Sequence, residues 1–265
     1  MQQLRCVKRY RRTAWSGRRN AAPVGRAGLP VSGQTTPAAV PPLITVAWAD
    51  RNAPPGYLSS KRTLDVVVSG LLLLILLPLW LLIALLIKLT SPGPVFYRGT
   101  VIGKGGRSFR YYKFRTMRAD SDNTAHKEWL EKFVKEDAAF SEDVSGKQVF
   151  KVVNDPRITS VGRYLRKLSL DEVPQMINVL LGDMSLVGPR PPVPYEYEHY
   201  DDIARQRVSV TPGITGLYQV TARSQVGFSG MLAIDLEYIR TRSFGGDIMI
   251  MLKTPWVMLT GKGAG

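Results

Sequence analysis

One uncharged apolar segment constrains the fold of this chain more than any other feature. Val66–Ile87 is 22 residues without a charged side chain, and only Ser69, Gly70 and Pro78 within it are not apolar. A straight helix of that length would be about 33 Å long, enough to cross the hydrocarbon core of a bilayer. A helix that is apolar on every face needs lipid or a very large protein core. In a chain of 265 residues the segment therefore predicts a membrane helix, not the core helix of a soluble domain.

Basic residues flank this segment on both sides. Lys61 and Arg62 precede it, and residues 88–115 contain seven Lys or Arg. The positive-inside rule places both flanks on the cytoplasmic side, which a single crossing cannot satisfy. Pro78 lies near the middle and removes the hydrogen bond that its N–H would give to the carbonyl of Leu74, so a bend is permitted there. A re-entrant helix within 57–92, broken at Pro78, is therefore favoured, and a spanning helix stays open as the alternative.

The net charge of +15 is unevenly spread along the chain. Residues 1–60 hold nine basic residues and one acid, whereas residues 61–265 hold 27 basic and 20 acidic residues. Residues 1–56 show no helix or strand period, which predicts a disordered basic leader; a transit peptide or a tail on anionic lipid fits it as well. Because the remaining body is only mildly basic, we expect no nucleic-acid partner. The single cysteine, Cys6, excludes an intrachain disulfide.

Two β-rich runs follow the apolar segment. Val95–Ile102 and Phe109–Met117 are separated by the glycine-rich stretch 103–106, which predicts a β-hairpin. Residues 120–140 have helical spacing of their large apolar side chains. The helix would open with Asp120-Ser121-Asp122, a D-x-D pattern that is found at metal–nucleotide-sugar sites but is interpreted here as a helix cap.

A second apolar helix is predicted at the C-terminus. Asp247–Thr260 is rich in Met and interrupted by Lys253 and Pro255, so it is too short to span and is expected to lie at the membrane surface with Trp256 among the headgroups. The predicted fold class is thus a mostly helical α/β, membrane-associated single domain. It combines a re-entrant membrane helix, a β-hairpin and short amphipathic interfacial helices, with residues 93–265 as the domain outside the membrane helix.

Asp171 and Glu172 are adjacent carboxylates at the start of a predicted helix. Ser169-x-x-Glu172 fits a capping box, and spacing alone favours that structural role. The chemical interpretation is specific, however. A helix dipole would lower the pKa of Asp171, an ionised Asp is a nucleophile toward phosphorus, and the neighbouring Glu172 could hold Mg²⁺. Arg166, Arg190 and Arg223 could clamp a diphosphate, although any one of them is more often a surface residue.

Seven short motifs occur in an order and spacing that resemble a known family. They are Lys61-Arg62-Thr63-Leu64-Asp65, Tyr112-Lys113-Phe114-Arg115-Thr116-Met117, Asp155-Pro156-Arg157-Ile158-Thr159, Leu170-Asp171-Glu172-Val173-Pro174-Gln175, Asn178-Val179-Leu180, Gly182-Asp183-Met184-Ser185-Leu186-Val187-Gly188-Pro189-Arg190-Pro191 and Pro212-Gly213-Ile214-Thr215-Gly216. From about residue 61 to residue 263 the chain resembles the monotopic phosphoglycosyl transferases of bacteria, the bacterial sugar transferase family, in what looks like a minimal catalytic form.

The resemblance implies a reaction and a set of site residues. Family members transfer a sugar-1-phosphate from a UDP-sugar to polyprenyl phosphate, usually undecaprenyl phosphate, and release UMP. This is the first membrane step of exopolysaccharide, O-antigen, capsule or glycoconjugate assembly. By the same resemblance Asp171 is the nucleophile that forms a covalent phosphosugar-aspartate, and Glu172 is associated with the cofactor Mg²⁺. The resemblance also assigns substrate or phosphate binding to a set of charged residues: Arg190, Arg166, Arg223, Lys113 and Asp235.

The family's membrane segment is a re-entrant helix broken at a proline, here Pro78. The resemblance thus implies the lipid bilayer as a partner and the bacterial inner membrane as the location, with the catalytic domain on the cytoplasmic face. The oligomeric state stays open, a homo-oligomer included. The chain departs from the family where Gly99 and Val101 stand at places that commonly hold Gln and Arg. The competing hypothesis is a non-enzymatic membrane-anchored scaffold that uses its basic leader and needs no Asp171.

Overall fold

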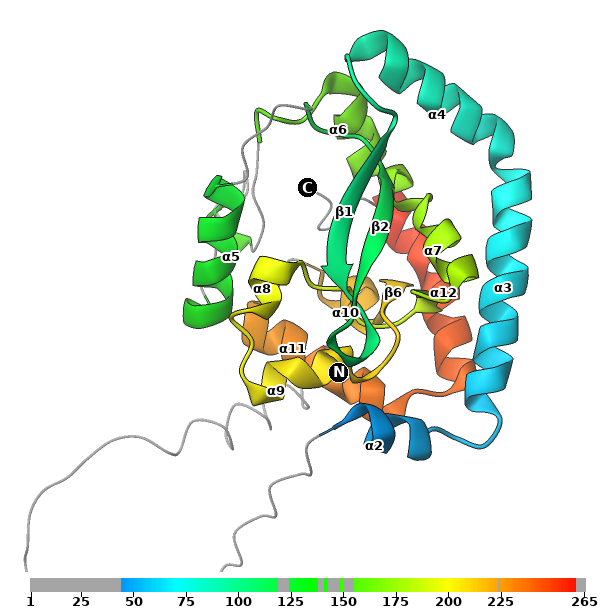
Figure 1. The fold of residues 1–265 in the computed structure, drawn as a ribbon, viewed down its shortest axis with the longest axis vertical. Coiled ribbons are helices and arrows are strands. Elements are labelled where there is room, and N and C mark those ends of the chain that lie inside the picture. Colours follow the sequence, from blue (N-terminus) through cyan, green and yellow to red (C-terminus); the bar gives the residue numbers. More distant parts are fainter. Residues whose placement is uncertain are drawn as a thin grey trace, which may run out of the picture. The chain divides into compact units, whose positions relative to one another are not determined.

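The computed structural model describes residues 44–118, 124–137, 141–142, 148–149, 155–223 and 225–260. The chain divides into two units, Met1–Leu43 and Ile44–Gly265, and every described element belongs to the second. The predicted D-x-D at residues 120–122 lies outside the described residues. The helices and strands in chain order, several of them labelled in Figure 1, are α2 (Val46–Arg51), α3 (Tyr57–Ile75), α4 (Leu77–Thr90), β1 (Phe96–Ile102), η1 (Lys104–Gly106), β2 (Ser108–Phe114), α5 (Thr124–Glu136), β3 (Ser141–Glu142), β4 (Gln148–Val149), α6 (Ser160–Lys167), η2 (Leu170–Glu172), α7 (Gln175–Leu181), β5 (Ser185–Val187), α8 (Pro194–Tyr197), α9 (Asp202–Arg205), η3 (Gln206–Ser209), β6 (Gly213–Thr215), α10 (Leu217–Thr221), α11 (Phe228–Thr241) and α12 (Phe244–Thr260).

The long apolar segment folds into two helices that meet at a bend. Within the described residues no single helix is long and apolar enough to cross a bilayer; α3 and α4 qualify only when taken together, and they are bent by 62°. The bend lies at Leu76, and Pro78 occupies the first turn of α4, where its missing N–H costs no helical hydrogen bond. The predicted break is therefore present, two residues before the proline. Large apolar side chains are exposed along both helices: Leu58, Val66, Val67, Leu71, Leu74, Ile75, Leu77, Leu81, Leu82, Leu85, Leu86 and Leu89.

The predicted hairpin is confirmed. β1 and β2 pair antiparallel from Phe96 opposite Phe114 to Ile102 opposite Ser108. Its turn contains Gly105 and Gly106. Both have a positive φ, a backbone conformation that residues with a Cβ atom rarely adopt. At the other end the rings of Phe96 and Phe114 stack with centroids 5.4 Å apart, and Trp80 of α4 meets Phe114 edge-on. The hairpin is thereby packed against the second half of the bent helix pair.

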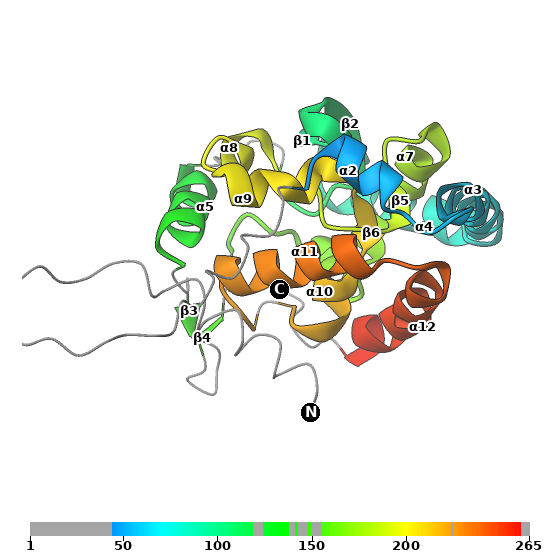
Figure 2. The ribbon, with the colours of Figure 1, turned by 90° about the horizontal axis from the view of Figure 1, so that it is seen from below.

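The largest buried cluster brings the hairpin together with a short parallel strand pair and the C-terminal helices. β5 pairs parallel with β6, Ser185 opposite Gly213 and Val187 opposite Thr215. Figures 1 and 2 both show α12 beside α3, with β6 nearby, and Figure 2 also labels β5 in this region. The fully buried members of this cluster are Ile44, Ala49, Val101, Tyr111, Val179, Met184, Leu186, Val187, Val210, Leu236, Tyr238, Ile239 and Ile250. The mostly helical architecture with a small amount of sheet agrees with that part of the predicted fold class, whereas the membrane association stays a prediction.

The leader predicted over residues 1–56 extends too far. Residues 44–56 contain α2, capped by Thr45, whose hydroxyl accepts from the N–H of Trp48. Ile44 and Ala49 are buried in the main cluster, and the backbone N–H of Ile44 donates to Gln206 Oε1 at 3.0 Å. The short apolar stretch of this region is thus a packing surface for the folded unit. The rest of the predicted leader, residues 1–43, lies outside the described residues.

The second apolar helix is confirmed as a helix and begins three residues earlier than predicted. α12 runs from Phe244 to Thr260 and continues through Pro255. It buries Ile250 but exposes a row of large apolar side chains: Met249, Leu252, Trp256 and Leu259. Its contact with a membrane surface stays a prediction.

Candidate active site

Asp171 and Glu172 lie in η2, a single 3₁₀ turn between α6 and α7. The capping box expected from Ser169 and Glu172 is wrong: in the described structure Ser169 makes no side-chain cap hydrogen bond. Its φ of 53° places it in the left-handed region, which is strained for a residue other than glycine, and such strain gathers at functional sites. The hydroxyl of Ser169 accepts instead from Arg223 Nη2 at 3.2 Å. The acidic pair is therefore held out of regular helix geometry.

Two basic side chains converge on the acidic pair. Lys113 Nζ lies 3.1 Å from Glu172 Oε1 and 3.8 Å from Asp171 Oδ2. Arg190 Nη1 donates to the same Glu172 oxygen at 3.1 Å. Asp171 is 6% exposed, whereas the Arg190 side chain is 48% exposed. The buried Asp171 thus lies beside Glu172, whose charge is compensated by Lys113 and Arg190. The Arg190 side chain extends from this pair toward solvent.

The structure brings most of the predicted site residues together. Arg166, on α6, and Arg190 lie near enough for their positive charges to lower the pKa of Asp171, against the larger effect of burial. Arg223 is joined to the turn through Ser169, as described. Asp235 is the exception: it is 1% exposed on α11 and bound to Arg207, with Arg207 Nε 2.9 Å from Asp235 Oδ2. Its side chain does not reach the acidic pair.

The two neighbouring carboxyl groups have pKa values that shift in opposite directions. Burial, reinforced by the negative charge of Glu172, raises the pKa of Asp171 above its usual value and outweighs the lowering by Lys113. Burial also acts on Glu172, but Lys113 and Arg190 outweigh it and hold the pKa of Glu172 at about 2. The expectation that a helix dipole lowers the pKa of Asp171 is therefore wrong, because the carboxyl group is buried in a single 3₁₀ turn.

A polar network behind the site fixes the strand that carries Lys113. Asn178 of α7 accepts from the backbone N–H of Tyr112 at 3.2 Å and donates to the carbonyl of Arg110. Gln175 Nε2 donates to the hydroxyl of Tyr111 at 2.8 Å. Sequence reasoning identified the stretches that contain these residues but gave Gln175 and Asn178 no role. Their buried amides join the strand to the helix that follows the acidic pair.

The sequence of this chain is similar to those of known proteins. A sequence model of the family described as bacterial sugar transferase matches residues 56–261. The exopolysaccharide production protein ExoY of Rhizobium meliloti is 42% identical over 195 residues, which are 74% of this chain and 83% of that protein.

The chain belongs to the bacterial sugar transferase family.

Other similar members of the sugar transferase family carry more specific names. An undecaprenyl-phosphate galactose phosphotransferase of Salmonella typhimurium is 43% identical over 205 residues, 77% of this chain and 41% of that protein. A UDP-glucose:undecaprenyl-phosphate glucose-1-phosphate transferase of Caulobacter vibrioides is 39% identical over 213 residues, 76% of this chain and 70% of that protein. The chain thus matches less than half of the first of these proteins and most of the second.

In this family member the first turns of α3 are bonded directly to the frame of the site. Lys61 Nζ donates to the carbonyl of Val187 at 2.8 Å, and Arg62 donates to the carbonyls of Val179 and Leu180 at 2.5 and 2.8 Å. The buried Asp65 accepts from the hydroxyl of Ser185 and the N–H of Leu186 through one oxygen. The Lys-Arg-x-x-Asp motif therefore joins the bent helix pair to α7 and β5.

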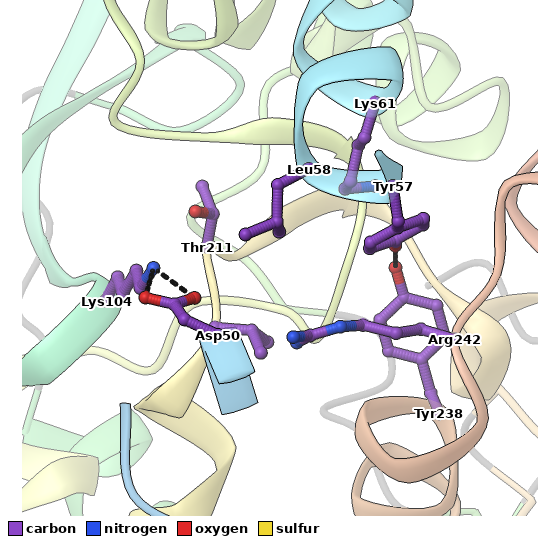
Figure 3. A pocket seen from close by; sticks show the side chains of 9 residues that line it. Asp50, Tyr57, Leu58, Lys61, Lys104, Thr211, Tyr238 and Arg242 are labelled. Carbon is purple, nitrogen blue, oxygen red and sulfur yellow. Dashed lines mark hydrogen bonds and ion pairs between the residues drawn. The ribbon is translucent and has the colours of Figure 1, made fainter. Parts of the chain in front are cut away.

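A separate pocket lies at the N-terminal end of α3, and Figure 3 shows eight of its lining residues with labels. Lys104 Nζ is 2.8 Å from both carboxylate oxygens of Asp50, and the hydroxyls of Tyr57 and Tyr238 are 3.4 Å apart. None of the residues around Asp171 lines it. This pocket therefore belongs to the attachment of α3, not to the acidic pair.

The two departures from the family pattern lie in β1. Val101 is buried in the main cluster, opposite Phe109. Gly99 lies opposite Tyr111, and a Cβ at Gly99 would come 2.7 Å from the ring of Tyr97. Neither position supplies a polar side chain to the acidic pair. The charged groups at the site come instead from β2, η2 and the segments that carry Arg166, Arg190 and Arg223.

The donor set fits a Mg²⁺ ion only if substrate completes its coordination. Among the described residues no group of three or more His, Cys, Asp or Glu side chains lies close enough to hold a metal. Mg²⁺ is commonly bound by one or two carboxylates together with substrate phosphates and water, and Asp171 and Glu172 can supply that share. Glu172 Oε1 already accepts from Lys113 and Arg190. Glu172 is the carboxylate that would hold the ion, together with phosphate oxygens of a bound substrate.

Proposed function

We propose that this chain transfers a sugar-1-phosphate from a UDP-sugar to undecaprenyl phosphate and releases UMP. The observation that carries the proposal is the buried Asp171 beside a Glu172 that is bound by Lys113 and Arg190, in a single 3₁₀ turn that follows a left-handed Ser169. The names of the relatives from Salmonella typhimurium and Caulobacter vibrioides support this substrate class. The reaction would be the first membrane step of exopolysaccharide or related glycan assembly.

The first step is an attack by a carboxylate oxygen of Asp171 on the sugar-bearing phosphorus of the donor. A bond forms between that oxygen and phosphorus, the bond from phosphorus to the bridging oxygen breaks, and UMP leaves with the electron pair. The product is a phosphosugar-aspartate. Arg190, Arg166 and Arg223 surround the acidic pair with positive charge, which stabilises the charge that moves onto the leaving UMP. Lys113 favours the ionised, reactive form of Asp171.

The second step passes the phosphosugar to the lipid. A phosphate oxygen of undecaprenyl phosphate attacks the same phosphorus, and the bond to Asp171 breaks, which regenerates the carboxylate and forms undecaprenyl diphosphate-sugar. Two in-line displacements at one phosphorus allow both substrates to use the same arginines in turn. When bound, Mg²⁺ held by Glu172 and Asp171 would neutralise phosphate charge.

The apolar surface supports a membrane location for the reaction. The exposed leucines of α3 and α4 and the exposed row on α12 would be costly in water and are expected to contact lipid. We propose that the bent pair enters the inner membrane from the cytoplasmic face and returns to it. The acceptor's phosphate would then meet Asp171 at the membrane surface, because α3 is bonded to α7 and β5 through Lys61, Arg62 and Asp65.

UMP release from a panel of UDP-sugars tests the proposed function. Undecaprenyl phosphate, Mg²⁺ and the purified chain are incubated with each donor, and formation of the lipid-linked product is measured alongside UMP. We expect one or a few donors to give both products in equal amounts. UMP without lipid product, or product formation that does not depend on Asp171, would contradict the proposal.

A further inference from the structure

The segment that carries Arg190 has no regular secondary structure, so other contacts must set its path. Residues 188–193 lie between β5 and α8. The N–H of Gly188 donates to the carbonyl of Thr215 at 2.8 Å, and the carbonyl of Pro189 accepts from Gly213 at 2.9 Å. Further along, the carbonyl of Pro192 accepts from Ile102 at 2.9 Å. The backbone on both sides of Arg190 is therefore bonded to neighbouring strands.

The carbonyl of Arg190 itself accepts a hydrogen bond from a buried guanidinium. Arg207 of η3 is 3% exposed, and its Nη2 lies 3.3 Å from Arg190 O. The other nitrogens of Arg207 are held by Asp235 at 2.9 Å and by the hydroxyl of Tyr200, with Glu196 3.5 Å away. Two carboxylates compensate one buried positive charge, and they fix the guanidinium in one orientation.

We infer that Arg207 is a positioning residue that acts through the backbone of Arg190 to aim the Arg190 guanidinium at the donor diphosphate. The inference rests on the proposed function. It also gives Asp235 a different role from the one predicted: the carboxylate orients Arg207 and does not touch substrate. The Arg190 side chain is half exposed and held by its ion pair with Glu172, so the position of its backbone limits where the guanidinium can reach.

A double-mutant cycle separates positioning from a merely structural role. The full chain is titrated calorimetrically with UDP as wild type, Arg207→Lys, Arg190→Ala and the double variant. A lysine can keep the ion pair with Asp235 but cannot also reach the Arg190 carbonyl. We expect Arg207→Lys to weaken UDP binding about tenfold when Arg190 is present and less than about twofold in the Arg190→Ala background, because contacting residues give non-additive effects.

Arg242→Lys is the matched control. Arg242 is also a buried arginine that donates to a backbone carbonyl, that of Ala49, and no recorded contact joins it to Arg190. Its replacement is expected to change UDP affinity equally in both backgrounds. Should Arg207→Lys fold poorly, Asp235→Asn tests the same inference. The asparagine has the size of the aspartate and can still accept from Arg207, but it lacks the charge that holds the guanidinium in place. This variant should show the same dependence on Arg190.

Each outcome is decisive. A loss that depends on Arg190 supports the inference. Equal losses for Arg207→Lys, or for Asp235→Asn, with and without Arg190 would overturn the inference and leave the proposed function intact. A wild-type chain that binds no UDP would overturn the proposed function, and the inference with it.

Discussion

At the scale of single residues, the site depends on two adjacent carboxyl groups in different surroundings. Asp171 is buried, and its pKa is raised, whereas the pKa of Glu172 is held at about 2 by Lys113 and Arg190. Opposite shifts in neighbouring groups are typical of sites in which each group has its own chemical task. Glu172 stays ionised between Lys113 and Arg190. In the proposed mechanism Asp171 would act as a poorly solvated carboxylate, which is a more reactive nucleophile than a fully hydrated one.

Asp171→Asn is expected to abolish transfer and to stabilise the fold at neutral pH. The folded-state pKa of Asp171 lies above its ordinary value of 3.8, so ionisation of this group costs stability once the pH exceeds that value. Asparagine removes the cost, and the melting temperature at pH 7 should rise by about 2–4 °C. The gain should vanish below about pH 4, where the wild-type carboxyl group is protonated in both states.

Glu172→Gln is the matched control for that prediction, with the opposite sign. The folded-state pKa of Glu172 lies below its ordinary value of 4.5, so its charge stabilises the fold above pH 4.5. This stability is lost as the pH falls toward about 2. Replacement of Glu172 should lower the melting temperature at pH 7. Equal shifts in the same direction for both variants, measured by calorimetric scans at pH 7 and pH 4, would contradict the assignment of opposite pKa shifts.

Lys113→Met is expected to move the acid limb of the pH–rate profile to higher pH. Lys113 lowers the pKa of Asp171 against the effect of burial, so its loss raises that pKa further and the reactive carboxylate forms only at higher pH. The dependence of kcat/KM on pH measures this in wild type and variant. Lys113→Arg keeps the positive charge and should leave the limb near its wild-type position. An unchanged limb in Lys113→Met would show that Lys113 does not influence Asp171.

At the scale of elements, the bent pair α3–α4 is bonded to the frame of the site at the start of α3, packs against the hairpin through α4, and has no recorded side-chain polar contacts in its apolar middle. Lys61, Arg62 and Asp65 bind the backbone of α7 and β5. Beyond them α3 presents apolar side chains as far as the bend at Leu76. A displacement of the start of α3 would therefore move the segments next to Asp171. We therefore expect insertion of the bent pair into a membrane to influence the geometry around Asp171.

Pro78→Ala is expected to straighten the pair and carry the start of α3 across the membrane. An alanine N–H at this position can donate to the carbonyl of Leu74, which extends the helix through the bend. Single cysteines placed at Ser59 or Ser60 in a Cys6→Ser background are labelled from outside intact cells. They should be inaccessible in the wild-type sequence and accessible in Pro78→Ala. Leu77→Ala keeps the proline and serves as the control; inaccessible cysteines in Pro78→Ala would mean that Pro78 does not maintain the bend.

At the scale of the whole chain, the folded unit begins at Ile44, and its N-terminal residues are part of the main cluster. Ile44 is bonded to Gln206, and Ala49 accepts from Arg242. The start of the folded unit is therefore bonded to residues that lie 162 and 193 positions away in the sequence. A catalytic unit defined from residue 57 onward would lack these buried contacts.

Two truncations are expected to differ sharply. Deletion of residues 1–43 should preserve transfer and thermal stability, because the folded unit remains whole. Deletion of residues 1–51 removes two buried apolar side chains and should lower the melting temperature by about 5 °C or more, since losses of 1–3 kcal/mol for each buried group are usual. If both truncations melt at the wild-type temperature, α2 contributes nothing to the fold. If deletion of residues 1–43 already abolishes transfer, the basic segment has a function of its own in the reaction.

Local patterns predicted the hairpin and drew attention to the acidic pair, but contacts between distant residues decided the surroundings of that pair. Glycines between two β-rich runs are a short-range signal, and they gave the turn at Gly105 and Gly106. The role of Asp235 could not follow from spacing, because only the fold brings Arg207 against it. The capping box failed for a similar reason: Ser169 adopts a left-handed conformation beside Arg223, which is 54 residues away.

The covalent role of Asp171 is tested most directly by one turnover without the lipid acceptor. The chain is mixed with an accepted UDP-sugar and Mg²⁺ in the absence of undecaprenyl phosphate. UMP is quantified, and the protein is digested for mass spectrometry. We predict about one UMP per chain and a phosphosugar on the peptide that contains Asp171, both absent in Asp171→Asn. UMP release that requires the lipid phosphate, or a label on a different residue, would contradict the mechanism.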